Sequence, residues 1–252
     1  MRRSRRPPSS SRLVIRFVYF DLDATLLDHG AAERAALADL WAAHPELGRH
    51  ALAHVQATYH GENAPLWGAY ARREVTRDEL QRLRFERTLA RLGAALDPDA
   101  VGAAYLARYA EHWAWIDGAR DAFLATAARL PVGILTNGFE AQQVAKLARF
   151  PEIADAAAVV VISERVGVQK PDPVIFEHAR AAAEAVVGAP LAPDEILYAG
   201  DSLASDVRGG RAAGWRVAWL GGDAAHEAVD GGVDVLEAWS DWDAVLARVG
   251  GR

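Results

Sequence analysis

Five short apolar runs recur along the chain, and they constrain its fold more than any other feature. The runs are Val14–Phe20, Val132–Leu135, Ala158–Ile162, Ile196–Ala199 and Arg216–Leu220. Most are rich in β-branched or aromatic side chains, which favours buried strands. Helical patterns separate the later four: one covers Gly118–Leu130, and another begins at Asp172-Pro173, an N-cap followed by proline. This alternation predicts an α/β fold in which helices cover a parallel sheet.

More than a hundred residues separate the first run from the second, far more than one crossover connection needs. Most of this span has helical patterns. Ala31–His44 repeats apolar residues, Thr76 and Glu79 have the spacing of a capping box, and Asp97-Pro98 begins a further helix. The sequence therefore predicts an all-helical insert within the α/β core.

The predicted organisation has three parts. They are a basic tail at residues 1–12, a core at residues 13–29 and 116–252, and a helical insert at residues 30–115. The joints are expected near Asp28–Gly30 and Trp115–Gly118. The tail holds five arginines and no acidic residue, and its content of Arg, Ser and Pro predicts disorder.

Charge and cysteine content exclude several classes of function. The formal net charge is −6 although the tail is basic, so the rest of the chain is acidic and a nucleic-acid partner is not expected. No cysteine is present, which excludes disulfides and thiolate chemistry. No apolar run is long enough to span a membrane, and Arg16 interrupts the apolar stretch that a signal peptide would need. We expect a soluble, cytoplasmic protein without a membrane partner.

Two carboxylates, Asp21 and Asp23, directly follow the first predicted strand. Ligands of open parallel sheets bind beyond the carboxyl ends of the strands. Two acids so close together are costly unless a positive charge lies between them, and a divalent cation would supply it. A solvated turn would explain the same residues.

Polar residues also follow the next strands. Thr136, Asn137 and Gly138 offer a hydroxyl, an amide and close backbone approach, as a phosphate site or a capped helix start would. Lysine occurs only at Lys146 and Lys170. Lys170 precedes a proline and suits a phosphoryl oxygen, or is a charge on a surface loop. We expect Lys146, within a helical pattern, to be solvated.

Asp201 and Asp206 follow the fourth predicted strand, Ile196–Ala199. Asp201 is placed to hold a metal ion, and Asp206, about one helical turn later, is placed to support it. A helix N-cap with an ordinary polar surface is the alternative. Each of these four segments is a modest signal alone, but all of them occur at predicted strand ends.

Together, these motifs closely resemble those of the haloacid dehalogenase superfamily, C1-capped subfamily I. The resemblance runs from Leu13 onward and rests on Asp21–Thr25, Thr136–Gly138, Lys170-Pro171 and Gly200–Asp206. It implies a Rossmann-like core with an all-helical cap domain inserted after the first strand. It also implies Mg²⁺-dependent hydrolysis of a small phosphate monoester through an aspartyl-phosphate.

The resemblance implies a role for each motif residue. Asp21 would be the nucleophile and Asp23 the general acid/base. Thr136, Asn137 and Lys170 would bind the phosphoryl group. Asp21, the Asp23 carbonyl and Asp201 would hold magnesium, and Asp206 would steady that site. Ala24 stands where many members have glycine, aspartate or asparagine.

Alternatives remain on the same fold. Dehalogenases of this family lack the second aspartate, which is present here as Asp23, and the phosphonatase needs an insert lysine that residues 30–115 lack. A sugar phosphomutase shares Asp23 and stays open. A non-catalytic protein that binds a phosphorylated ligand is the alternative from another class.

An esterase is a further alternative, because Gly200 to Leu203 spells the GDSL string and Asp223 and His226 follow it. That would make Ser202 an acyl-transfer nucleophile. It is disfavoured because those esterases carry their serine near the N-terminus, far ahead of the Asp-x-x-His motif, whereas Ser202 lies close to it. The esterase hypothesis would also leave Asp21, Asp23 and Lys170 without a role.

The substrate is not specified by the motifs. Thr136–Phe139 and Ser205–Gly210 resemble the branch that contains pyrimidine nucleotidases and N-acylneuraminate-9-phosphate phosphatases, which implies a nucleoside monophosphate or a sugar phosphate. Specificity is expected in the insert. The side chains considered for the cleft are Arg72, Arg73, Trp67, Tyr70 and His29.

Overall fold

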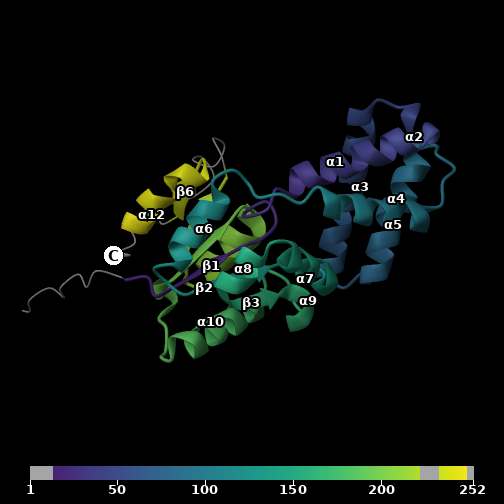
Figure 1. Cartoon of the computed structure of the whole chain (residues 1–252). Coiled ribbons are helices and arrows are strands. Elements are labelled where there is room, and N and C mark those ends of the chain that lie inside the picture. The colour runs from purple at the N-terminus through teal and green to yellow at the C-terminus, as the bar shows by residue number, and fades with distance from the viewer. Residues whose placement is uncertain (1–13, 222–232, 249–252) are drawn as a thin grey trace, which may run out of the picture.

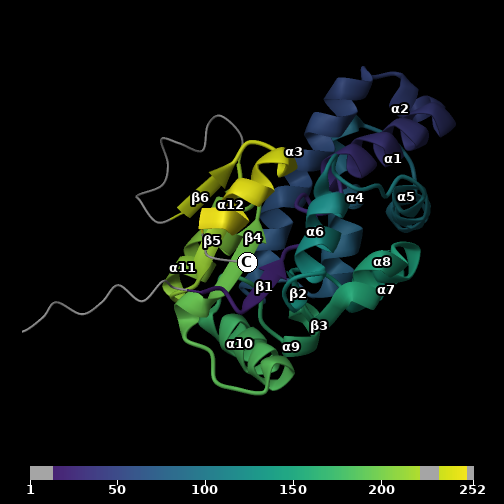
Figure 2. The same ribbon diagram turned by 60° about the vertical axis from the view of Figure 1, so that its left-hand side comes forward.

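The computed structural model describes residues 14–221 and 233–248, in which six parallel strands form one sheet of order β3-β2-β1-β4-β5-β6. The strands are β1 (Phe17–Phe20), β2 (Val132–Thr136), β3 (Ala157–Ile162), β4 (Ile196–Gly200), β5 (Arg216–Leu220) and β6 (Val233–Leu236). Figure 2 shows β6 and β3 at opposite edges. This is the predicted Rossmann-like α/β arrangement. The strand order reverses between β1 and β4, which is the switch point where such sheets bind ligands.

Both faces of the sheet are covered, which explains why the strands are almost continuously apolar. The main covering helices are α6 (Ala119–Ala127) and α12 (Trp242–Arg248) on one face and α10 (Pro173–Val187) on the other. Side chains of β1 alternate between the faces: Val18 and Phe20 pack with Phe123, whereas Phe17 and Tyr19 pack with the side of α10.

Five helices lie between β1 and α6 and form a separate bundle. They are α1 (His29–Ala43), α2 (Pro45–Gly48), α3 (Leu52–Ala71), α4 (Arg77–Leu92) and α5 (Pro98–Glu111). Figure 1 shows them gathered at one end of the molecule, connected to the sheet by two segments. Their core contains Leu37, Tyr59 and Tyr105. The predicted capping box of Thr76 and Glu79 is confirmed at the start of α4.

Short helices complete the connections around the sheet. They are α7 (Glu140–Arg149), α8 (Pro151–Ala156), α9 (Ser163–Val166), α11 (Arg208–Ala212), the 3-10 turns η1 (Pro193–Glu195) and η4 (Trp239–Asp241), and the π-helical turn η2 (Leu203–Val207). No helix in the described part of the chain is long and apolar enough to cross a membrane. The predicted tail, residues 1–12, lies outside that part.

The sheet differs from prediction at its ends. The first strand begins at Phe17, not at Val14, because its neighbours β4 and β2 begin opposite Phe17 and Val18. Before Phe17, the Arg16 N–H still donates to Glu195 O at 2.8 Å. Val14 is accordingly 50% exposed. The strand β6 was not predicted, since Asp234 interrupts its short apolar run. The other strand boundaries agree with the predicted ones within one residue.

Candidate active site

Asp21 and Asp23 lie in the turn that follows β1, at the switch point of the sheet. The backbone N–H of Asp21 still donates to Ala199 O at 2.8 Å, which fixes its carboxylate beside the end of β4. The chain then turns sharply at Ala24, whose φ is 61°, and the Ala24 N–H donates to Leu27 O. This left-handed conformation favours glycine, asparagine or aspartate, the residues that the family often has at the position of Ala24.

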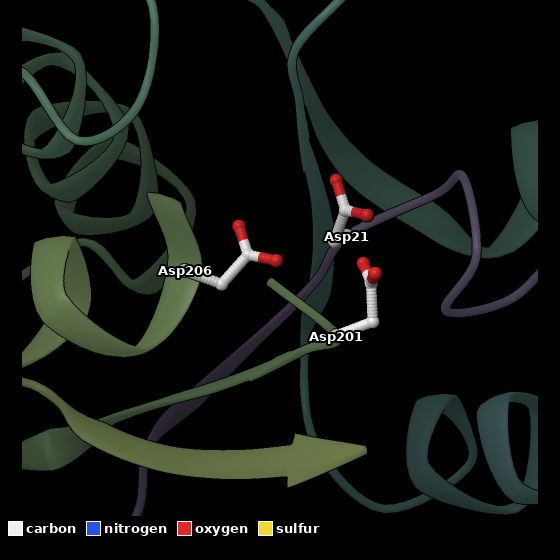
Figure 3. Close-up of side chains that lie close together, drawn as sticks. All are labelled: Asp21, Asp201 and Asp206. Carbon is white, nitrogen blue, oxygen red and sulfur yellow. The ribbon is translucent and has the colours of Figure 1, made fainter. Parts of the chain in front are cut away.

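Three carboxylates converge at this point (Figure 3). Oxygens of Asp21, Asp201 and Asp206 all lie within 4.8 Å of one another. They come from the turn after β1, the end of β4 and η2, and Thr25 Oγ1 lies 3.3 Å from an oxygen of both Asp21 and Asp201. Carboxylate oxygens are the ligands that Mg²⁺ prefers, so the donor set fits this ion.

Burial makes these carboxylates costly as anions. Burial raises the pKa of Asp21 to about 8; Lys170 opposes this rise, and Asp206 and Asp201 add to it. Burial and the neighbouring Asp206 raise the pKa of Asp201 to about 6. Three acids share one lysine here, so a divalent cation would compensate the remaining negative charge.

Lys170 is the cation of the cluster and is only 4% exposed. Its Nζ donates to Asp21 Oδ1 at 2.6 Å and to the hydroxyl of Tyr198 at 2.7 Å, and it lies 2.8 Å from Asp206 Oδ1. Burial lowers the pKa of Lys170, but the carboxylates of Asp206 and Asp21 outweigh burial and hold it above its ordinary value. The surface-loop alternative is therefore excluded.

Asp206 supports this arrangement from η2. Tyr198 OH donates to its Oδ1 at 2.9 Å, and the Ser202 N–H donates to its Oδ2 at 2.9 Å. Asp206 is 1% exposed. Its oxygens thus already accept hydrogen bonds from the protein, which suits a residue that fixes Lys170 and the loop after β4.

Thr136 and Asn137 lie beside the same cluster, at the end of β2. The Asn137 amide donates to Lys170 O at 3.1 Å and accepts from the Lys170 N–H at 2.9 Å, so it links the loop after β2 to the loop that carries Lys170. Thr136 is buried, and its Oγ1 accepts from Gln143 Nε2 at 3.2 Å. All the residues singled out along the sequence for this site therefore lie at the carboxyl ends of the parallel strands.

Asp23 has separate surroundings and does not belong to the carboxylate cluster. Lys146 Nζ donates to its two oxygens at 2.5 and 2.7 Å, and Gln143 Nε2 donates to Oδ2 at 2.9 Å. Burial alone would raise the pKa of Asp23, but Lys146, His29 and Gln143 outweigh burial and lower it. The pKa values of these two neighbouring acids are thus shifted in opposite directions, that of Asp21 upward and that of Asp23 downward.

The prediction that Lys146 is solvated is wrong. Lys146 is 1% exposed, and its Nζ lies 5.5 Å from the ring centroid of Tyr109 and 5.7 Å from that of Trp113. Gln143 and Lys146 are three residues apart, so both face inward from α7. Two signals could have found it: this spacing directly after Thr136–Gly138, and the rarity of lysine, which applies to Lys146 as much as to Lys170.

A cavity of about 390 Å³ lies beside Asp23 and reaches into the helical bundle. Of the side chains considered for the cleft, His29 and Trp67 line it. Tyr70 and Arg73 instead line a second hollow, of about 430 Å³, which Lys170 also lines. Arg72 lines neither of these two and pairs with Glu74 at the surface. We take the cavity beside Asp23 as the substrate's, because it alone of the two includes that carboxylate.

The esterase alternative gains no support from the described residues. Ser202 Oγ accepts from the Ser205 N–H at 3.2 Å, which caps η2. Asp223 and His226, the other members of the hypothetical triad, lie outside the described residues.

The sequence and the structure are both similar to those of known hydrolases. The family model described as haloacid dehalogenase-like hydrolase matches residues 15–214. Pyrimidine 5'-nucleotidase YjjG of Escherichia coli is 35% identical over 164 residues, which cover 64% of this chain and 68% of YjjG. Pyrimidine 5'-nucleotidase PynA of Streptococcus pneumoniae is 31% identical over 208 residues, which cover 81% of this chain and 83% of PynA.

Among solved structures, the magnesium-bound HAD-hydrolase YfnB of Bacillus subtilis has a TM-score of 0.74 and 26% identity. The match covers 92% of this chain and 99% of YfnB. L-2-haloacid dehalogenases also have this fold, at 18 to 19% identity, so the likeness to them concerns the fold alone.

Proposed function

The chain belongs to the haloacid dehalogenase-like hydrolases, and from this membership we propose that it is a magnesium-dependent phosphatase that uses Asp21 as its nucleophile. The observation that carries the proposal is the division of labour between two acids only two residues apart. Asp21 lies against Lys170 in the carboxylate cluster, whereas Asp23 lies against Lys146 at the substrate cavity. Acids in such different surroundings suit different tasks.

In the first step, an Asp21 oxygen attacks phosphorus and the bond from phosphorus to the leaving oxygen breaks. Asp23 gives its proton to that oxygen, so an alcohol departs and an aspartyl-phosphate remains. In the second step, Asp23 takes a proton from water, the water oxygen attacks phosphorus, and the Asp21–phosphate bond breaks. The products are inorganic phosphate and the regenerated enzyme.

The lowered pKa of Asp23 suits the second step, in which Asp23 must accept a proton. The acid form needed first is favoured once a phosphate dianion lies nearby, because a second negative charge raises the pKa of a carboxyl group. Lys146 and Gln143 hold the Asp23 side chain at the cavity throughout. We therefore propose that Lys146 and Gln143 are positioning residues for Asp23.

Asp21, the Asp23 carbonyl and Asp201 would hold Mg²⁺, with Asp206 in support. When bound, the ion would offset the charge of the phosphoryl oxygens. Lys170 would also offset that charge, and Thr136 and Asn137 would complete the phosphate site.

We also propose that residues 30–115 act as a cap domain over the core formed by residues 13–29 and 116–252. Separate apolar cores in the bundle and around the sheet support this division. The position of the cap over the core is supported by a contact between the two parts, in which Phe139 of the core stacks on Trp67 of α3 with 5.0 Å between ring centroids. A cap that closes there would keep bulk water from the aspartyl-phosphate.

For the substrate we propose a small phosphorylated metabolite, a nucleoside monophosphate or a sugar phosphate. The two relatives called pyrimidine 5'-nucleotidases support testing pyrimidine nucleotides first.

The test is phosphate release from p-nitrophenyl phosphate, with Mg²⁺ or with EDTA, by the wild type and by Asp21→Asn. We expect release that needs Mg²⁺ and falls by at least about 10³-fold in the variant, because the amide cannot act as the nucleophile. Release that survives in Asp21→Asn would exclude Asp21 as the nucleophile. Transfer between two hydroxyls of one sugar, with little free phosphate, would favour the mutase instead.

A further inference from the structure

The cavity beside Asp23 ends among polar side chains of the helical bundle. Asp23 and Asn137 line it from the core, whereas Asn63, Arg84 and Tyr105 line it from α3, α4 and α5. Its volume of about 390 Å³ suits a small ligand. A monoester whose phosphate lies between Asp21 and Asp23 would direct its leaving group toward these bundle side chains.

Arg84 is a buried cation that forms no ion pair among the described residues, and it is only 5% exposed. Its guanidinium carbon lies 5.1 Å from the ring centroid of Tyr105 and 5.3 Å from that of Phe85. The Arg84 Nε donor has no hydrogen-bond partner. A buried donor without a partner is costly, and an acceptor on a ligand would remove that cost.

Asn63 provides the complementary group. It is 7% exposed, and its Oδ1 is a buried acceptor without a partner. Asn63 and Arg84 belong to neighbouring helices that pack together, and both line the same cavity. Both side chains thus line the cavity, and each carries one buried polar atom that has no partner within the protein.

We infer that Arg84 and Asn63 bind the leaving group and select one with a carbonyl next to an N–H on a planar ring, as in the base of uridine 5'-monophosphate. The carbonyl would accept from Arg84, and the N–H would donate to Asn63 Oδ1. This inference rests on the proposed function, because it assumes that the phosphate is bound at Asp21.

A leaving group with a second negative charge fits less well. Glu33 also lines the cavity and is only 8% exposed. Its nearest positive partners are the imidazoles of His29 and His60, at 3.8 and 3.6 Å, which are charged only when protonated. The Glu33 carboxylate offsets the charge of Arg84 in the same cavity and would repel an anionic leaving group, whereas it tolerates a neutral ring.

The test compares kcat/KM for uridine 5'-monophosphate with that for ribose 5-phosphate, which has the same sugar and phosphate but no base. We expect the wild type to prefer the nucleotide. Arg84→Met should lower kcat/KM for the nucleotide by about 10- to 100-fold and leave ribose 5-phosphate nearly unchanged. Asn63→Leu should act in the same direction.

Arg82→Met is the matched control, because Arg82 lies on the same helix, is exposed and pairs with Glu86. It should change neither substrate. Thermal melting shows whether the Arg84 and Asn63 variants fold; should Arg84→Met not fold, Arg84→Lys replaces it, because lysine keeps the charge but loses the forked donor geometry.

Three results would overturn the inference while the proposed function stands. They are equal losses on both substrates in a folded variant, a wild-type preference for ribose 5-phosphate, and a wild-type preference for 3-phosphoglycerate, whose leaving group carries a carboxylate. Failure of the proposed function looks different, since wild type would then release no phosphate from p-nitrophenyl phosphate either.

Discussion

Lys146 shows how one buried side chain can matter to a reaction without belonging to a recognised motif. Its ammonium contacts both oxygens of Asp23, and the rings of Tyr109 and Trp113 lie beside it. A carboxylate that accepts hydrogen bonds at both oxygens is restrained to one orientation by the donor. Asp23 must meet the leaving oxygen and then a water in the same place, so this restraint should favour both proton transfers.

We predict that Lys146→Met lowers kcat for p-nitrophenyl phosphate by about 10- to 100-fold, because Asp23 loses the partner that orients it. KM should change little, since Lys146 is not expected to bind the phosphate. Lys146→Arg should recover much of the loss, as it restores a donor to the carboxylate. Steady-state kinetics measure both parameters.

Arg149→Met is the control for Lys146→Met, because Arg149 lies at the exposed end of the same helix. It should leave kcat unchanged. A folded Lys146→Met protein with wild-type kcat would mean that the pair between Lys146 and Asp23 is only structural.

At the scale of elements, α7 connects the loop after β2 to the bundle. Phe139, the residue that precedes α7, is 2% exposed and packs with Leu66, Leu80 and Trp67 of α3 and α4. The Arg77 guanidinium carbon lies 5.3 Å from the Phe139 ring centroid. Phe139, two positions after Asn137, is therefore fixed by helices of the bundle, which couples the position of the bundle to the loop after β2.

We predict that Phe139→Ala lowers kcat/KM by about tenfold, through a higher KM together with a lower kcat. The physical reason is that the truncated side chain no longer anchors α3 and α4 against the loop after β2, so the cap closes less completely. Kinetics with uridine 5'-monophosphate give the two parameters.

Val144→Ala serves as the matched change for Phe139→Ala, since Val144 is on α7 and 43% exposed. Its kinetics should equal those of the wild type. An unaltered kcat/KM in folded Phe139→Ala would show that the aromatic contact does not govern closure.

At the scale of the whole molecule, the carboxylate cluster joins parts of the chain that are far apart. Asp21 follows the first strand, and Asp201 and Asp206 follow the fourth. An ion held by Asp21 and Asp201 would stabilise the folded state alone, because the unfolded chain holds these acids apart.

The pH dependence follows from Asp21, whose pKa rises from 3.8 to about 8 in the metal-free fold. The folded protein keeps a proton that the unfolded chain loses above about pH 4. The stability that this group contributes is therefore complete below that pH and is lost as the pH rises through about 8. Mg²⁺ competes with this proton, so Mg²⁺ should bind more tightly as the pH rises over the same range.

We predict that Mg²⁺ at 100 times its Kd raises Tm by about 5–10 °C at pH 8. The same concentration should raise Tm by less at pH 6, because protons on Asp21 and Asp201 oppose binding. Differential scanning calorimetry with Mg²⁺ or EDTA measures the shifts. Asp201→Asn should lose most of the shift, while Asp155→Asn, at an exposed position of α8, should keep it. A shift of equal size at both pH values would contradict the proton competition.

The sequence by itself determined the parallel α/β fold, the family and the gathering of the motif residues at the carboxyl ends of the strands. The physical reason is geometric. Strand and helix patterns are local, and parallel strands must bring their carboxyl ends to the same edge, so residues that follow those strands meet there. Thus Asp21, Thr136 and Asp201 could be grouped without coordinates. Strand ends were less certain, because the first residue of β1 depends on where its neighbours begin.

Only the tertiary structure decided which side chains of the helices face the site. A helical pattern shows that α7 has an inner face, but not that this face meets Asp23 and buries Lys146. In the same way, nothing local to α3 or α4 places Asn63 and Arg84 in one cavity. Those contacts depend on how α7 packs beside the turn that carries Asp23 and on how α3 packs against α4. Such packing is set by the shapes of many side chains that are distant in the sequence.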